Sequence, residues 1–487
     1  MVETGTQKVL VVGLDGATFD VLTPMMHRGL LPHLAKLIGE GVSGPLRSVV
    51  PPVSGPAWVS FMTGKDPGRH GIYDFYKFAP GRKGKRIISF RDIHARSLWE
   101  VLTTHGKKVG AINVPITFPP YPVDGFMLTG MLTPPDAEAR QAHPPELYKE
   151  LTARFGTFST DVWWTNYRAN EKPQFFAGHD RLHGSASGDL PVSHAGKTPG
   201  VSSLTTITET DRLQHAFACS CSTIPKRTAG RMPRKCGGCS TNFSSVWINI
   251  WVPCAKAAGP ETSLFIVSDH GFGPTTDFPD QPVAGSRRIP DGEGRRLSVE
   301  SHSGPDPQPS GRTEGGAGLG ANRCTQIGCG GRRPRVGGCN AESETHLIEC
   351  VDWDRTVAFM DLDDRQGIYI NLRGREPRGR PSSTSRVRIA SSPLRKVVHP
   401  RTRQPLLTYA KRREEVYDGP FVEAAPDIIL CFNDFETYGV GVLGFGVFRR
   451  GLWAKPKWPW FSAHHRMDGV LVAHGTNIRH RRMTDAS

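Results

Sequence analysis

A short apolar run that ends abruptly in an acid, an imidazole and a glycine constrains this chain more than any other stretch. Between Ser263 and Ser268 the residues are continuously apolar and rich in Phe, Ile and Val, which predicts a buried strand. Asp269 and His270 follow it directly. Ligands bind at the carboxyl ends of strands in an open α/β sheet, so these two side chains are candidate metal ligands. A turn in which Asp269 caps the next segment would have the same sequence. Other parts of the chain are needed to choose between a metal-binding role and a capping role.

The N-terminal segment repeats this arrangement. Residues 8–14, KVLVVGL, predict a first strand, and Asp15-Gly16 ends it before an amphipathic helix over about residues 19–38. Asp15 is therefore a second acid at a strand end. Its alternative role is that of an N-cap for the following helix.

Ser54 stands at the start of a third candidate feature. It follows two prolines in SVVPPVSGPAW and precedes an apolar helical turn over residues 57–62. A helix N-terminus offers free backbone N–H groups and the positive end of the helix dipole, which suits a serine that holds a phosphoryl group. The alternative is that Ser54 is only an N-cap.

The order of elements predicts the fold class. A helix to about residue 102, strands at residues 109–113 and 125–129, and a helix at 145–155 alternate, and a strand runs into a helix over 203–217. Such alternation is typical of an α/β protein, here a three-layer α/β/α arrangement with a mostly parallel central sheet. Short strands are expected again after residue 348, within residues 412–432 and within 464–475.

Three tracts, residues 178–202, 218–253 and 275–345, lack any such pattern. Gly, Ser, Pro, Arg and Cys replace the aliphatic residues there, and such a composition cannot bury a core. Two hypotheses account for them: disordered insertions, or out-of-frame translation in a gene whose reading frame is lost and regained. In both cases we expect a single core across residues 1–487 with these tracts as interruptions.

Charge and cysteine content narrow the partners and the compartment. The net charge of +15 favours an anionic partner such as a phosphorylated metabolite, a nucleic acid or an acidic lipid. The first residues lack the features of a signal peptide and no apolar run is long enough to span a bilayer, so we expect a soluble, cytoplasmic protein. Nine of the ten cysteines lie between Cys219 and Cys350, but their irregular spacing disfavours a zinc ribbon.

Asp211 and His215 add a further pair of candidate ligands. They stand at positions i and i+4 at the start of a helix, so their side chains share one face; a solvated pair is the more frequent alternative. Nitrogen and oxygen donors without thiolates suit zinc, and also manganese. Two dications would outweigh Asp15, Asp211 and Asp269 by one charge, so a phosphate ester is the expected guest.

Six separated motifs resemble, in the same order, those of the alkaline phosphatase superfamily, specifically its type I phosphodiesterase/nucleotide pyrophosphatase family. They are LVVGLDGATFD, VVPPVSGPAW, TGKDPGRHGIYDF, TETDRLQH, IVSDHGFGP and HHRMDG, and the resemblance covers about residues 5–178, 203–217, 254–274 and 346–478. It implies a metal-dependent hydrolase of phosphate esters, of phosphodiester or nucleotide pyrophosphate type, with Ser54 as nucleophile through a phosphoserine. It implies a first ion held by Asp15, Ser54, Asp269 and His270 and a second held by Asp211, His215 and His465.

Two assignments need more than the motif letters. His465 is preferred to His464 and His474 because the last histidine of the family directly precedes a short turn such as RMDG. Asp74 stands where the family offers a polar group to the phosphoryl oxygens, and an acid there would have to be protonated or turned to a metal. We expect a small anionic phosphate-ester substrate, with a nucleotide as one candidate, no specific nucleic acid and no membrane span.

Several alternatives stay open or lose ground at this point. A sulfatase needs Arg four residues after its nucleophile, and Trp58 stands there. The letters of residues 439–444 match a dinucleotide fingerprint but lack a βαβ context. A phosphomonoesterase or phosphotransferase of the same superfamily, and a non-catalytic anion-binding protein with a damaged core, remain alternatives to the diesterase.

Overall fold

A computed structural model describes the chain in several segments separated by gaps. The described residues are 8–78, 85–155, 202–217, 262–274, 354, 358–360, 367–376, 379, 398, 405, 407–432, 463–475, 478 and 481–482. Apart from Ser202, the unpatterned tracts at residues 178–202, 218–253 and 275–345 lie outside them, as does the stretch at 439–444. No helix within these described segments is long and apolar enough to cross a membrane.

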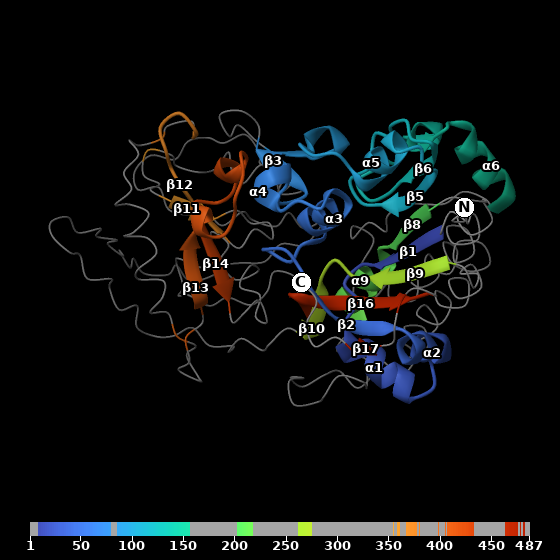
Figure 1. Cartoon of the computed structure of the whole chain (residues 1–487). Coiled ribbons are helices and arrows are strands. Elements are labelled where there is room, and N and C mark those ends of the chain that lie inside the picture. The colour runs from blue at the N-terminus through green and yellow to red at the C-terminus, as the bar shows by residue number, and fades with distance from the viewer. Residues whose placement is uncertain are drawn as a thin grey trace, which may run out of the picture.

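A nine-stranded sheet forms the centre of the molecule (Figure 1). Its middle strands are mutually parallel, and antiparallel neighbours join at both sides. The prediction of a mixed α/β fold with a mostly parallel central sheet is confirmed. In spatial order the strands are β17 (Arg481–Arg482), β2 (Val42–Arg47), β16 (Asp468–His474), β9 (Thr262–Val267), β1 (Lys8–Leu14), β8 (Ser202–Ile207), β5 (Val109–Val114), β6 (Gly125–Thr129) and β7 (Ala142–His143).

Alternate residues of β5 and β6 face two different helix layers, because side chains alternate across a strand. Val109 and Met127 pack with α3 (Ser54–Thr63) and α5 (Leu98–Thr104), whereas Ile112 and Leu128 pack with α6 (Glu146–Phe155). Helices therefore cover both faces of this half of the sheet, as a three-layer α/β/α arrangement requires.

The expected single helix over residues 19–38 is wrong. Two helices occupy the stretch, α1 (Phe19–His27) and α2 (Pro32–Glu40). Gly29 adopts a left-handed φ of 72°, which is typical of a helix end, and the ring of Pro32 cannot continue a preceding helix but fits the first turn of a new one.

A second, four-stranded antiparallel sheet lies on the other side of α3 and α4 (Pro67–His70) from the central sheet (Figure 1). Ile429 of this sheet and Tyr417, in the connection between its last two strands along the chain, pack with Tyr73 and the half-buried Val50. The sequence predicts three of its strands and misses β13. The strands are β11 (Ala358–Met360), β12 (Gly367–Ile370), β14 (Ile428–Phe432) and β13 (Leu407–Arg412).

Candidate metal centre

The ends of β1 and β9 bring the first acids together. The two strands are parallel neighbours, with Gly13 opposite Val267, so the residues that follow them lie at one edge of the sheet. Asp15 and Asp269 are both buried there, and the backbone N–H of Gly16 donates to Asp269 Oδ1 at 3.1 Å. The Asp269 carboxylate thus lies against the turn that carries Asp15.

Ser54 points into the same place from the first residue of α3. Its Oγ lies 3.1 Å from Asp15 Oδ1 and 3.1 Å from His270 Nε2. Val53 is the N-cap residue of α3, so the capping role considered for Ser54 is wrong. The capping role considered for Asp15 is also wrong, because Thr18 caps α1 by accepting from Asp20 N at 3.3 Å.

Helix α9 (Glu209–Phe217) presents Asp211 and His215 from the neighbouring strand end. His215 Nε2 lies 3.4 Å from Asp211 Oδ1, as the i, i+4 spacing predicts. Two side chains fix this helix to the Asp15 turn: Thr210 Oγ1 donates to Asp15 O at 2.6 Å, and Gln214 Nε2 donates to Gly16 O at 2.6 Å. The helix therefore cannot shift without moving the turn.

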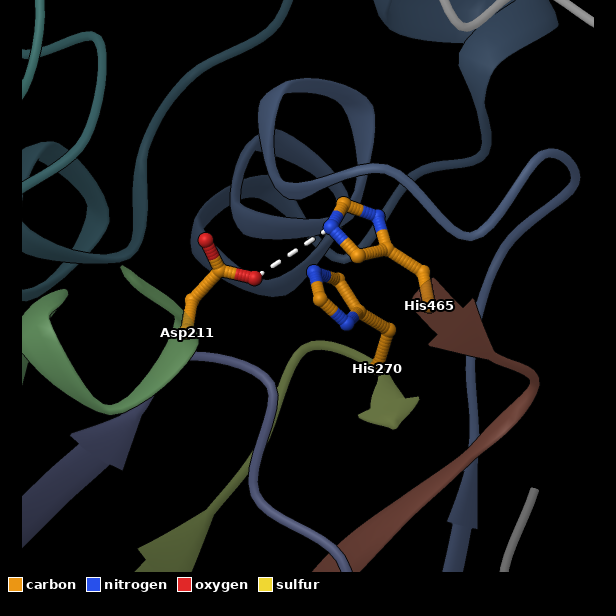
Figure 2. Close-up of side chains that lie close together, drawn as sticks. All are labelled: Asp211, His270 and His465. Carbon is orange, nitrogen blue, oxygen red and sulfur yellow. Dashed lines mark ion pairs between the residues drawn. The ribbon is translucent and has the colours of Figure 1, made fainter. Parts of the chain in front are cut away.

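His465 arrives from a strand near the C-terminal end of the described chain. Strand β15 (Ala463–Arg466) pairs antiparallel with β10 (Gly271–Pro274), and this register sets His465 opposite Phe272. His465 Nε2 lies 3.2 Å from Asp211 Oδ1 (Figure 2). It also lies 3.0 Å from His215 Nε2. Its ring also stacks on that of His270 with centroids 3.8 Å apart.

The other two late histidines lie elsewhere. The His464 ring contacts His215 edge to face at 5.5 Å, and His474 Nε2 lies 3.5 Å from Glu40 Oε2 at the end of α2. His465 is therefore the one of the three whose ring nitrogen lies against Asp211.

The side chains form two ligand groups, which we name by their residues. The first ligand group is Asp15, Ser54, Asp269 and His270; the second ligand group is Asp211, His215 and His465. Ligand atoms of Asp15, Asp269 and His270 lie within 4.8 Å of one another, and so do those of Asp211, His270 and His465. Two ions could thus be held side by side, with His270 between them.

Hydrogen bonds to backbone carbonyls fix which imidazole nitrogens face the centre. His465 Nδ1 lies 2.9 Å from Pro52 O, and His270 Nδ1 lies 2.9 Å from Gly271 O. A carbonyl oxygen only accepts, so each Nδ1 carries a proton and each Nε2 faces the centre. Burial lowers the pKa of His270 to about 3, so its ring is neutral and its Nε2 lone pair points inward. A metal-binding histidine is commonly oriented by a partner of this kind.

The Nε2 atom of the neutral His270 ring is an acceptor that faces other acceptors, because it lies 3.3 Å from Asp269 Oδ2 and 3.4 Å from Asp15 Oδ1. Within the described part of the chain, Asp211 Oδ1 and Asp269 Oδ2 are buried and accept no hydrogen bond. Buried acceptors without donors are costly, and a cation between them removes that cost. The donor set fits a divalent metal, with nitrogen and oxygen ligands that suit zinc.

The electrostatics of the two groups differ. Burial raises the pKa of Asp15 well above its ordinary value, and the neighbouring Asp269 and Asp211 add to this; burial also raises the pKa of Asp269 to about 7. Burial on its own would raise the pKa of Asp211, but His215 and His465 outweigh it and hold this pKa well below the ordinary value. Burial lowers the pKa of His270 to about 3, so its ring is neutral at physiological pH.

Asp74 is buried close to the N-terminus of α3. A Cβ at Gly55 would lie 3.4 Å from its backbone carbonyl carbon, and its Oδ1 accepts from Phe75 N at 2.6 Å. The nearby Arg69 pairs with Asp66 and Asp418 at the surface. Asp74 therefore lies beside the start of α3, whereas Arg69 forms ion pairs at the surface.

Two residues that hydrogen-bond to the candidate ligands are not among those predicted from the sequence. The indole Nε1 of Trp58 donates to Asp15 Oδ2 at 3.1 Å, and Ser48 Oγ donates to Asp269 O at 2.5 Å. The spacing of Trp58, one helical turn after Ser54, is a sequence signal for the contact of Trp58. The contact of Ser48 has no such signal in the sequence.

The fold is that of alkaline-phosphatase-like hydrolases. Over 99% of this chain and 92% of the other, a crystal structure of phosphonoacetate hydrolase from Sinorhizobium meliloti 1021 superposes with a TM-score of 0.52 at 14% identity. A mutant of the alkaline phosphatase PafA gives a TM-score of 0.50 at 11% identity, over 100% of this chain and 94% of the other. Murine ectonucleotide pyrophosphatase / phosphodiesterase 5 gives 0.49 at 14% identity, over 99% and 91%.

The family match is more specific than the fold. Residues 9–228 match the family described as type I phosphodiesterase / nucleotide pyrophosphatase, which confirms the resemblance carried by the motifs. A search of curated proteins gives no match.

Proposed function

We propose that the chain hydrolyses phosphate esters, of the phosphodiester or nucleotide pyrophosphate type, through a phosphoserine on Ser54. The observation that carries this proposal is the position of Ser54 Oγ, 3.1 Å from both Asp15 Oδ1 and His270 Nε2 at the first residue of a helix. We assign two divalent ions, zinc with manganese as the alternative, to the first and second ligand groups. When bound, the ions lower the pKa of a coordinated hydroxyl or water and neutralise charge on the phosphoryl oxygens.

A hydrogen bond to a neighbouring carboxylate orients the Ser54 side chain. Its hydroxyl has one proton, and Asp15 Oδ1 accepts it while the Oγ lone pairs stay directed toward the centre. In the proposed first step Ser54 Oγ forms a bond to phosphorus, the ester P–O bond breaks, and the leaving oxygen gains the proton that Ser54 loses. Water then forms a P–O bond, the bond to Ser54 Oγ breaks, and the phosphate product leaves.

The start of α3 supplies donors for the phosphoryl oxygens. The first N–H groups of a helix have no acceptor within it and lie at the positive end of its dipole. Asp74 lies against this turn, and we propose that it faces the phosphoryl group in its protonated form or turned to a metal. Under this proposal Asp74→Asn retains a donor and most of the turnover, whereas Asp74→Ala loses both.

Turnover of a chromogenic diester and a chromogenic monoester tests the proposal. Ser54→Ala should lower both rates by at least about 10³-fold while the bound metal changes little. Ser60→Ala is the matched control, because Ser60 lies on the same helix and its Oγ contacts His70 at 2.9 Å. A wild-type protein that binds metal yet hydrolyses neither ester would favour the anion-binding alternative. The ratio of the two wild-type rates separates a diesterase from a monoesterase.

A further inference from the structure

Trp58 lies on the same face of α3 as Ser54, one turn further along the helix. Its side chain is fully buried, with 0% exposure, and it is among the largest fully buried side chains of the described chain. Its indole N–H nevertheless reaches a carboxylate, because Nε1 donates to Asp15 Oδ2 at 3.1 Å. A buried indole N–H usually finds an acceptor, but here the acceptor belongs to a candidate metal ligand.

The two oxygens of Asp15 are thereby given different partners. Oδ2 accepts from Trp58, whereas Oδ1 accepts from Ser54 Oγ at 3.1 Å and lies 3.4 Å from His270 Nε2. The carboxylate plane is fixed by these two donors, one at each oxygen. Only Oδ1 faces the serine and the first ligand group.

Close packing holds the indole in this orientation. A Cβ at Gly13 would lie 2.5 Å from Trp58 Cη2, closer than real carbon contacts allow, so the ring fills the space that a side chain at position 13 would need. The ring of Phe61 meets it edge to face at 5.8 Å. Gly13 lies near the end of β1, two residues before Asp15, so the ring packs against the strand that leads to the carboxylate.

We propose that Trp58 is a positioning residue of the metal centre, whose indole N–H engages Asp15 Oδ2 so that the carboxylate offers Oδ1 alone to an ion and to Ser54. The inference rests on the proposed function, since it takes Asp15 as a metal ligand. Donors to the outer atoms of metal ligands typically change metal affinity by about 10- to 100-fold when they are removed. The change should fall on the ion of the first ligand group and spare the other.

The test replaces Trp58 with benzothienylalanine, which keeps the bicyclic ring but has sulfur in place of the N–H, and with Phe. Zinc is titrated into the metal-free full chain in competition with a chromogenic chelator. We expect one of the two zinc affinities to fall about 10- to 100-fold and the other to stay within about threefold of wild type.

Trp99→Phe is the matched control. Trp99 is also buried, and its Nε1 donates to Tyr121 Oη rather than to a metal ligand. Its loss should lower thermal stability and leave both zinc affinities unchanged.

Three results are informative. If both zinc affinities of the benzothienylalanine variant equal those of wild type, the inference is overturned and the proposed function stands. A fall in both affinities that Trp99→Phe reproduces assigns Trp58 a purely structural role and also overturns it. A wild-type protein that binds no zinc contradicts the proposed function and the inference together.

Discussion

The first and second ligand groups meet at His270 but are built differently. The first gathers residues from the ends of adjacent parallel strands and from the start of α3, and it contains two carboxylates against one imidazole. The second combines a helical pair with a histidine from β15, and it sets one carboxylate against two imidazoles. The difference shows in the charges: the pKa values of Asp15 and Asp269 are raised, mainly by burial, whereas that of Asp211 is lowered by its histidines.

This contrast indicates that the two groups depend on a cation to different degrees. In the second ligand group the imidazoles already stabilise the ionised carboxylate. In the first, two buried carboxylates repel each other, and either a proton or an ion must offset their charge. We therefore expect the two groups to respond differently to substitution and to pH.

The largest expected effect comes from removing His270, the member of the first ligand group that lies between the two groups. His270→Ala takes a ligand from the first ligand group and the stacked neighbour from His465. Turnover should fall by on the order of 10³-fold or more, and both zinc affinities should drop. His474→Ala removes a histidine beside Glu40, so it is expected to leave turnover and zinc content near wild type. Equal losses in the two variants would contradict the assignment of the site.

Removing a ligand of the second ligand group should have a narrower effect. His465→Ala deletes the side chain that lies against Asp211 Oδ1, so one ion should be lost while the other is retained. Turnover is expected to fall by about 10²- to 10³-fold, and the zinc content measured by atomic absorption should approach half that of wild type. Retention of the full zinc content would show that the second group is wrongly composed.

The sequence goes far in predicting these groups because their members stand at recognisable places. Asp15, Asp269 and His270 follow apolar strands, and Asp211 with His215 shows the helical spacing. The spacing of Trp58 from Ser54 places both on one face of a helix, but the hydrogen bond from Trp58 to Asp15 could not be predicted, because it depends on the space left by Gly13.

Long-range pairing limits prediction in the same way. The contact of His465 with Asp211 depends on the β10–β15 register, and the orientation of its ring depends on the carbonyl of Pro52. Neither is encoded by local periodicity. Pro32 marks the division of residues 19–38 into two helices, because its ring fits the first turn of a helix and not the interior of one.

Zinc binding should strengthen with pH, and the first ligand group should cause it. In the metal-free protein the pKa of Asp269 is raised to about 7, so its proton must leave before an ion binds, and affinity should rise up to about pH 7 and then level off. The folded state holds this proton more tightly than the unfolded state, so the contribution of Asp269 to metal-free stability is lost as pH rises through about 7.

Thermal unfolding between about pH 6.5 and pH 8 measures this effect, with Asp269→Asn as the reference for every other group that titrates there. The gap in Tm between zinc-loaded and metal-free protein should widen across that range. Asp269→Asn cannot titrate, so its gap should change less with pH. A gap that is equally steep in wild type and variant would assign the titration to another residue.

The smallest expected effect concerns support of the second ligand group by the four-stranded sheet. Tyr417 Oη donates to Val50 O at 2.7 Å, two residues before the Pro52 carbonyl that orients His465. Tyr417→Phe should cost about 1 kcal/mol of stability and reduce turnover severalfold. Tyr73→Phe is the control, since Tyr73 Oη donates to Phe421 O at 3.1 Å and should cost similar stability without a change in turnover. Unchanged turnover in both variants would separate this sheet from the site.

The positions of bound ions test the central claim most directly. Crystals of the protein grown with zinc, measured at the zinc absorption edge, should give two anomalous peaks. One is expected among Asp15, Ser54, Asp269 and His270, and the other among Asp211, His215 and His465. A single peak, or peaks away from Ser54, would contradict the account.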